Sequence, residues 1–263
     1  MKAITANIRC CTKTDRGLKR SRNEDSFIVI ENIQKQHHAD SGTGTLFAVA
    51  DGMSGHIGGG TASRMAIEGL RKHYMNPVNN RGPIPANGEK ENLRDLEKVV
   101  LSIHHEISVM SERVEKYKYM GTTLSVLLLY ERSALITHVG DSRIYRLRGG
   151  HLEQLTHDDT MAQLSVEMGY LQADEAAGHP LSHAVMQALG QGVDELQSKK
   201  VQIKSGDVFL LCSDGLYDMV SDNDIQKFLH QSPTGGKPCD LLVEAALANG
   251  GSDNVTVIIV QIL

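Results

Sequence analysis

Short apolar runs that begin or end at acidic residues are the feature that most constrains the fold of this chain. Runs of four to six residues that are rich in β-branched and aromatic side chains predict buried strands. Acidic residues stand at the tips of such runs: Glu24-Asp25 before Phe27–Ile30, Asp51 after Leu46–Ala50, Asp214 after Val208–Cys212, and Asp253 before Val255–Val260. A carboxylate at a buried strand tip costs free energy unless a positive charge offsets it. The pattern therefore predicts strands that converge on one shared acidic site.

The residue types at these tips indicate which positive charge the site would hold. Carboxylates without adjacent His or Cys favour a hard divalent cation. In Asp51-Gly52 and Asp214-Gly215 the glycine permits a sharp turn, and its bare backbone lets a carbonyl oxygen approach a ligand. A plain turn is the commoner explanation of one Asp-Gly pair. Several such sites beside apolar strands favour a metal centre instead.

A pair of divalent cations that shares a carboxylate suits the hydrolysis of phosphate esters, because the cations activate water and neutralise charge on phosphoryl oxygens. Three alternative chemistries have no matching motif in the sequence. It contains no GxxxxGK[ST] loop for nucleotide phosphates, no GxSxG serine-hydrolase motif, and no HExxH or HxxEH zinc motif.

Size and composition set broad limits on the class of protein. The 263 residues form one large domain or two small ones, and 40% hydrophobic with 22% charged residues is ordinary for a soluble globular protein. The net charge of -5 argues against general affinity for nucleic acids. The spacing of Cys10, Cys11, Cys212 and Cys239 gives no CxxC pair and no disulfide framework. We therefore expect no disulfide and a reducing cytoplasm, with no signal peptide and no membrane span.

The pattern of apolar residues predicts an α+β protein, with sheets packed together and covered by helices. Strands are expected at Ile28–Glu31, Thr45–Ala50, Thr123–Tyr130, Ala134–Val139, Arg143–Arg148, Gln202–Ile203, Val208–Cys212 and Val255–Ile262, and Gly149-Gly150 predicts a hairpin. Helices are expected at Thr61–Tyr74, Leu93–Lys118 and Val243–Asn249. Loops are expected at Met75–Asn92 and His37–Gly44, and helical patches within the polar segment Asp158–Gly178.

An ordered set of motifs extends from Thr14 to the C-terminus. The motifs are Thr14-Asp15-Arg16-Gly17, Arg20-Ser21-Arg22-Asn23-Glu24-Asp25-Ser26, Asp51-Gly52-Met53-Ser54-Gly55-His56, Gly121-Thr122-Thr123, Gly140-Asp141-Ser142-Arg143, Cys212-Ser213-Asp214-Gly215-Leu216-Tyr217-Asp218 and Ser252-Asp253-Asn254-Val255-Thr256. Each motif is weak alone, but together and in this order they resemble the metal-dependent serine/threonine phosphatases of the protein phosphatase 2C (PP2C, or PPM) type. The resemblance is to the bacterial catalytic domain of that family.

The resemblance implies an αββα sandwich of two antiparallel sheets and a role for each motif residue. Asp51 would bridge two Mn²⁺ or Mg²⁺ ions, with the Gly52 carbonyl, Glu24, Asp25, Asp214 and Asp253 completing the site. A third, weaker ion would lie at Asp141 and Asp218, for which a turn residue and a helix cap are the alternatives. Arg20 would grip the substrate phosphate, since a guanidinium offers a fork of two donors. Asp51, Arg20 and Asp25 are therefore the expected catalytic residues.

Some positions depart from the family pattern or have two explanations. Met53 stands where eukaryotic members carry a His that is proposed to protonate the leaving group, and His56 lies nearby. Residues 158–178 correspond to the flap beside the active site. His179 and His183 follow the flap where relatives have HPxxN, and Pro180 argues against a helix that would present both to a metal, so we expect a structural role for them. Arg143 is expected to buttress the strand tip that carries Asp141.

The leading hypothesis is a single catalytic domain over residues 1–263 that hydrolyses phosphoserine and phosphothreonine in proteins. Its expected partners are the phosphorylated substrates of a cognate Ser/Thr kinase, and we expect a cytoplasmic monomer that binds neither nucleic acid nor membranes. One alternative is a phosphoprotein-binding regulatory module of the same fold with little catalytic activity. Another is a hydrolase of a small phosphoester.

Overall fold

The computed structural model describes residues 7–33, 44–53, 58–75, 89–130, 132–176, 178–231 and 237–263. The strands among them are β1 (Ile8–Asp15), β2 (Ser26–Ile33), β3 (Gly44–Ala50), β4 (Leu124–Tyr130), β5 (Ser133–Val139), β6 (Arg143–Arg148), β7 (His151–Gln154), β8 (Gln197–Gln202), β9 (Val208–Cys212) and β10 (Val255–Ile262). The helices are α1 (Gly59–Met75), α2 (Glu89–Arg113), the 3₁₀ helix Glu115–Tyr117, α3 (Met161–Glu167), α4 (Ala173–Ala176), α5 (Asp214–Tyr217), α6 (Asp222–Gln231) and α7 (Pro238–Ala248).

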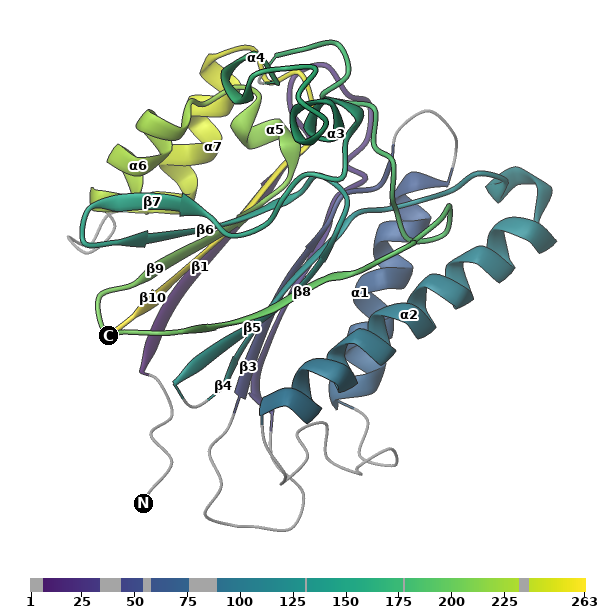
Figure 1. Cartoon of the computed structure of the whole chain (residues 1–263), viewed down its shortest axis with the longest axis horizontal. Helices are drawn as coiled ribbons and strands as arrows, with labels where there is room; N and C mark the ends of the chain where they lie inside the picture. Colours follow the sequence, from purple (N-terminus) through teal and green to yellow (C-terminus); the bar gives the residue numbers. More distant parts are fainter. Residues whose placement is uncertain are drawn as a thin grey trace.

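The described strands form two antiparallel five-stranded sheets. One sheet has the order β1-β10-β9-β6-β7 and the other the order β2-β3-β4-β5-β8. Helices α1 and α2 cover the outer face of the second sheet, while α6 and α7 cover the first (Figure 1). The predicted αββα sandwich is thus confirmed.

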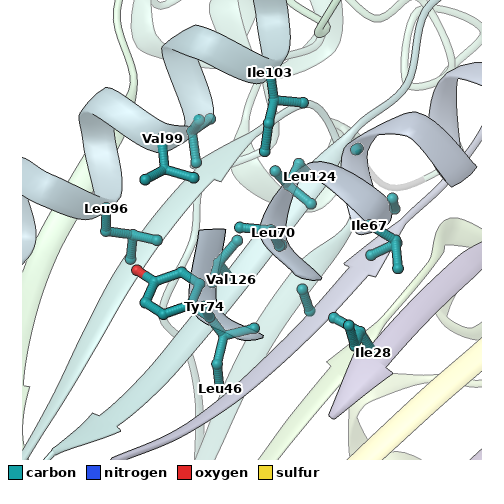
Figure 2. Packing of buried hydrophobic residues seen from close by; sticks show 14 of the residues in the cluster. Ile28, Leu46, Ile67, Leu70, Tyr74, Leu96, Val99, Ile103, Leu124 and Val126 are labelled. Carbon is teal, nitrogen blue, oxygen red and sulfur yellow. The ribbon is translucent and has the colours of Figure 1, made fainter. Parts of the chain in front are cut away.

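Successive residues of the central strands point alternately into two hydrophobic cores, one under the helices and one between the sheets. In β3, Leu46 and Ala48 face α1 and α2, whereas Phe47 and Val49 face the other sheet. Figure 2 shows the first of these cores, where Leu70 of α1 and Leu96 of α2 lie over the sheet. Strands buried on both faces need apolar side chains at successive positions, which is why they read as continuous apolar runs.

The elements with strong apolar patterns lie where the sequence predicts them. The three expected strands at Arg143–Arg148, Val208–Cys212 and Val255–Ile262 are observed with those bounds. The hairpin also forms, with Gly149 and Gly150 both at positive φ in its turn. The predicted tip at residues 37–44 and most of the predicted loop at 75–92 lie outside the described residues, and α2 begins at Glu89, earlier than predicted.

Several elements differ from the prediction, among them the long helix α2, which ends at Arg113 and not at Lys118. The strand expected at Gln202–Ile203 occupies Gln197–Gln202, a polar edge strand without apolar alternation. Helix α6 was not predicted, and α7 begins at Pro238 rather than Val243. Proline suits the first turn of a helix, where its missing N–H costs nothing.

A disulfide joins the first strand to the last helix, which corrects the expectation of none. Cys11 of β1 and Cys239 of α7 are bonded, with their Cα atoms 6.2 Å apart. The two residues are 228 positions apart in the chain, so no short cysteine spacing in the sequence predicts this disulfide. Among the described residues, no helix is long and apolar enough to cross a membrane.

Candidate metal centre

Both sheets deliver carboxylates to the same end of the sandwich. Asp25 lies just before β2 and Asp51 just after β3 in one sheet, while Asp214 follows β9 and Asp253 precedes β10 in the other. Helix α5, which begins at Asp214, lies at this end of the sheets (Figure 1). The convergence has a topological cause, because antiparallel neighbours place the end of one strand beside the start of the next.

Hydrogen bonds across the two sheets fix the position of Asp25. Its Oδ2 accepts from Ser213 Oγ at 2.7 Å and from Thr256 Oγ1 at 2.6 Å; Ser213 directly follows β9 and Thr256 lies in β10, both of the other sheet. Its Oδ1 is buried and has no hydrogen-bond partner among the described residues. One oxygen of this carboxylate is therefore held by the protein and the other is left for a ligand.

Asp51 and Gly52 are positioned by the backbone around β4. The Asp51 N–H donates to Thr123 Oγ1 at 2.9 Å, and the Asp51 carbonyl accepts from Thr122 Oγ1 at 2.7 Å. A side chain at Gly52 would meet the backbone of Gly59 at 2.4 Å. Only glycine allows α1 to start this close to the site.

Glu24 joins the site to the first turn of α1. Its Oε1 accepts from the Gly60 N–H at 3.2 Å, which satisfies a free donor at the helix start. The Asn254 side chain accepts from the Glu24 N–H at 2.8 Å. Glu24 is therefore half-buried and tied both to the start of α1 and to Asn254, which precedes β10.

The charges of the assembled carboxylates oppose one another. Removal from water raises the pKa of Asp25 to about 6, and the charge of Asp253 adds to the shift. Burial, followed by the charges of Asp25 and Asp214, raises the pKa of Asp51 well above its ordinary value. The pKa of Asp214 is raised in the same way, by burial first and then by Asp141 and Asp253. Without a cation, this arrangement is electrostatically unfavourable.

Arg20 reaches into the carboxylate group from the loop between β1 and β2. Its Nη2 donates to Asp253 Oδ2, and this bond is the main reason that the pKa of Arg20 is raised. The neighbouring Arg22 is exposed and makes no ion pair among the described residues. Of these two cations, only Arg20 faces the site.

Asp141 sits deeper, behind a buried ion pair. It is only 4% exposed, and burial followed by the charge of Asp158 raises its pKa to about 7. Arg143 donates to Asp158 from Nε and Nη2, the latter at 2.6 Å, and stacks on the ring of Tyr217 at 3.6 Å. The Tyr217 hydroxyl donates to the Asp141 carbonyl at 3.0 Å. Arg143 thus supports the segment that carries Asp141, in agreement with its expected structural role.

Asp218 and His183 face each other at the edge of the site. His183 Nδ1 lies 3.6 Å from Asp218 Oδ2, and both residues line a cavity of about 850 Å³ together with Arg20, Asp214 and Asp253. The sequence pattern did not bring His183 into the site, because it reaches Asp218 by the turn after the flap and not along a helix. His179 does not join this cluster, and His56 lies outside the described residues.

The cysteines near this site are not suited to act as a thiolate nucleophile. Cys10 and Arg16 have the spacing of thiolate phosphatases, but Cys10 lies in the extended strand β1, and burial raises the pKa of its thiol. Cys212 is fully buried in β9, and desolvation raises its pKa strongly. A reactive thiolate requires the opposite shift.

The donor set fits divalent cations. Two enclosed oxygens, Asp25 Oδ1 and Asp214 Oδ1, have no hydrogen-bond partner among the described residues. Both belong to carboxylates whose pKa is raised by burial and by like charges. Several convergent carboxylate oxygens without a thiolate form the ligand set that Mg²⁺ and Mn²⁺ prefer.

Comparison with known proteins places the chain in a family. The sequence model of the protein phosphatase 2C family matches residues 22–241. The chain belongs to the protein phosphatase 2C family. It is 33% identical over 250 residues to the serine/threonine phosphatase stp of Listeria monocytogenes, a match that covers 95% of this chain and 94% of that protein.

Two further matches concern phosphatases called PstP. The chain is 35% identical over its whole length to the serine/threonine protein phosphatase PstP of Mycobacterium tuberculosis, of which it spans 46%. It is also similar to a crystal structure of the catalytic domain of PstP in complex with two manganese ions. There the TM-score is 0.77 and the identity 34%, over 97% of each chain. The prediction of a PP2C-type phosphatase is confirmed at the level of the family.

Proposed function

We propose that this PP2C-family chain is a Mn²⁺- or Mg²⁺-dependent phosphatase that hydrolyses phosphoserine and phosphothreonine in proteins. The observation that carries the proposal is the meeting of four carboxylates from two sheets, with enclosed oxygens on Asp25 and Asp214 that accept no hydrogen bond from the described residues. The relatives named as serine/threonine phosphatases, one of them with two manganese ions bound, support the same chemistry.

Each expected ligand has a position that suits its proposed role. Asp51, flanked by the charges of Asp25 and Asp214, would be shared by two cations. Asp25, the Gly52 carbonyl and Glu24 would complete the side formed by one sheet, and Asp214 and Asp253 the side formed by the other. When bound, such cations supply an activated water and neutralise charge on the phosphoryl oxygens.

Arg20 would bind and orient the phosphate group of the substrate. In this structure Arg20 pairs with Asp253. We propose that, when a cation binds the Asp253 carboxylate, the N–H groups of the Arg20 guanidinium become free to donate to phosphate. Met53, which directly follows Asp51-Gly52, has no ionisable proton to donate to a leaving group. Protonation of the leaving oxygen would therefore fall to water in the site.

Residues 158–178 would form the flap of a single catalytic domain. Gln154, Asp158, Thr160, Ala162, Gln163, Ala176 and Gly178 line the same cavity as Arg20 and Asp253. A peptide bound at Arg20 would then lie against this segment. The physiological partners would be phosphoproteins made by a Ser/Thr kinase in the cytoplasm, acted on by a monomer.

The test is hydrolysis of a phosphothreonine peptide by purified protein. We expect EDTA to abolish turnover and Mn²⁺ to restore it. A folded, metal-loaded protein that binds the phosphopeptide without hydrolysing it would support the alternative of a regulatory binding module. Turnover of small phosphoesters but not of phosphopeptides would instead support a small-molecule hydrolase.

A further inference from the structure

Two positively charged side chains lie beside the start of α1, which itself begins against Gly52 of the candidate metal centre. They are Arg64 of α1 and Lys116 of the 3₁₀ helix. A Cβ atom placed on Gly60 would lie 3.4 Å from Arg64 Nη1 and 3.4 Å from Glu24 Cγ. Because residue 60 is glycine, no side chain at that position separates the other two. The Arg64 guanidinium therefore lies close to Glu24, at the rim of the candidate site.

Two half-buried hydroxyl groups, of Thr61 and Tyr117, connect these exposed cations. The Arg64 Nη2 group donates to Thr61 Oγ1 at 3.3 Å. Lys116 Nζ lies 4.6 Å from the centre of the Tyr117 ring, within the range of a cation–π contact. Interaction with Lys116, followed by interaction with Thr61, lowers the pKa of Tyr117. The charge of Arg64 acts in the same direction, so these four side chains form one basic cluster that favours negative charge.

The two charges of the basic cluster are not neutralised within the part of the chain that the structure describes. Neither Arg64 nor Lys116 forms an ion pair there, and the first turn of α1 contains no acidic residue. By contrast Arg71, two turns further along α1, lies 3.3 Å from a carboxylate oxygen of Glu68. The cluster can therefore accept an anion from outside the described chain.

We propose that Arg64, Lys116 and Tyr117 bind a second anionic group of the substrate, a carboxylate or a further phosphate near the phosphoresidue that is hydrolysed. The inference rests on the proposed function, because it names the class of phosphoprotein that the site would favour. A guanidinium fork, an ammonium group and a phenolic hydroxyl are donors that suit the oxygens of either anion. An extended peptide advances about 3.3–3.6 Å per residue, so side chains one to three positions from the phosphoresidue can reach the rim of the site.

The basic cluster would also set the direction in which a peptide crosses the site. Arg64 lies beside α1 and Glu24, which belong to the side of the second sheet. The cavity of about 850 Å³ is instead lined by the flap and by Asp214 of α5, on the side of the first sheet. A peptide whose phosphate lies at Arg20 would then have one flank against the flap and the other towards α1.

The deciding experiment compares phosphothreonine peptides that differ only in the residues one to three positions away on either side. One set has alanine there, one has glutamate, and one has a non-hydrolysable phosphonate analogue of phosphoserine. For the unmodified, Mn²⁺-loaded protein we expect KM to be about threefold to tenfold lower with one or both anionic sets than with the alanine set, at similar kcat. The preference should shrink between about 0.1 M and 1 M salt, because screening weakens exposed charge pairs. The two anionic sets distinguish carboxylate from phosphate as the preferred group.

Matched variants locate the preference on the protein. Arg64→Gln should remove it and leave KM and kcat for the alanine peptide within about twofold, because Arg64 is not needed to hold the hydrolysed phosphate. Lys116→Gln tests the second cation and serves as the test if Arg64→Gln does not fold. Arg71→Gln changes a cation of the same helix that is paired with Glu68, so it is the control and should keep the preference.

Two results would overturn the proposal: equal KM values for neutral and anionic peptides in the unmodified protein, or a preference that survives both Arg64→Gln and Lys116→Gln. Absent hydrolysis of every peptide would contradict the proposed function instead. The relative affinities of fluorescently labelled peptides for the Mn²⁺-loaded protein, measured by anisotropy, would then test the basic cluster without any turnover.

Discussion

The negative charges of Asp51 and Asp214 are proposed to bind metal, but they destabilise the folded protein when no metal is bound. We predict that Asp51→Asn and Asp214→Asn each lower turnover at least about a hundredfold, since each removes a charge that would face the reacting phosphate. The same changes should raise the melting temperature of the metal-free protein, because burial and like charges disfavour both carboxylates. Thermal unfolding in EDTA and phosphopeptide kinetics in Mn²⁺ measure the two effects. Asp174→Asn, an exposed flap carboxylate, should change neither.

The raised pKa values predict how the stability of the metal-free protein depends on pH. The pKa of Asp25 is about 6 and that of Asp141 about 7 in the folded state, above the value of about 3.8 in an unfolded chain. Between pH 4 and 7 the folded protein therefore binds more protons than the unfolded chain, so these groups make stability fall as pH rises.

Melting temperatures in EDTA across this pH range test the prediction. The decline should be shallower in Asp141→Asn than in the unmodified protein, because one of the carboxyl groups with a raised pKa is gone. Saturating Mn²⁺ should flatten the decline further, since a cation favours the charged carboxylates. Equal slopes in all three samples would contradict the prediction.

Arg20 and Arg22 offer a matched pair of cations two positions apart. Arg20→Ala should raise KM about tenfold or more with a smaller change in kcat, because phosphate binding acts largely on the ground state. Arg22→Ala should leave KM within about twofold, because its side chain is exposed and unpaired in the described part of the chain. A change confined to kcat in Arg20→Ala would refute the role of a phosphate clamp.

At this scale the meeting of Asp25, Asp51, Asp214 and Asp253 at one end of the sheets could be predicted, because each stands at the tip of a strong apolar strand. Their roles as metal ligands stay a prediction. The sequence did not predict the closeness of His183 to Asp218, which depends on the path of an irregular segment. The hydrogen bonds from Ser213 and Thr256 to Asp25 could not be predicted either, because they join residues that are 188 and 231 positions apart in the sequence.

The segment from β6 to the start of the flap is held by the ion pair of Arg143 and Asp158. Their side chains are 19% and 13% exposed, and removing one partner of a buried pair leaves the other charge uncompensated. We predict that Arg143→Met lowers the free energy of unfolding by about 3–5 kcal/mol. Urea unfolding measures this change. Lys227→Ala breaks the exposed pair with Asp224 and should cost less than about 1 kcal/mol.

Among whole elements, Val208–Cys212 and Val255–Ile262 were predicted with their observed bounds, because strands buried on both faces leave little room for polar side chains. Strand β8 was misplaced because an edge strand tolerates Gln, Ser and Lys. Helix α6 did carry a signal, with Ile225, Phe228 and Leu229 at helical spacing. Ser221 also accepts from the Asp224 N–H and donates to its carboxylate, which is a capping arrangement at the start of that helix.

At the scale of the molecule, the disulfide between Cys11 and Cys239 links the two ends of the chain. Closing a loop of this length is expected to stabilise the folded state by about 2–5 kcal/mol. We predict that reductant, or Cys239→Ser, lowers the melting temperature accordingly. Thiol titration of the unfolded, unreduced protein should find the two free cysteines Cys10 and Cys212. Four titratable thiols in that sample would show that the bond does not form.

The association of the two sheets could be predicted only through the ordered motifs. No single apolar run tells which sheet a strand will join, because strands of both sheets, such as β3 and β9, are apolar on both faces. The resemblance to PP2C phosphatases supplied that missing long-range information, and the topology then confirmed it.

The order of strands in the first sheet has a consequence for synthesis of the protein. The edge strand β1 pairs only with β10 among the described strands, and Asp15 lies opposite Val255, about 240 residues later. At about 5–20 residues per second, the ribosome needs roughly 12–50 s to supply that partner. All strands of the other sheet have been translated by Gln202, before Asp214 and Asp253 exist. A nascent chain therefore lacks Asp214 and Asp253 until those positions have been translated, and a fragment that ends before Asp214 would be inert.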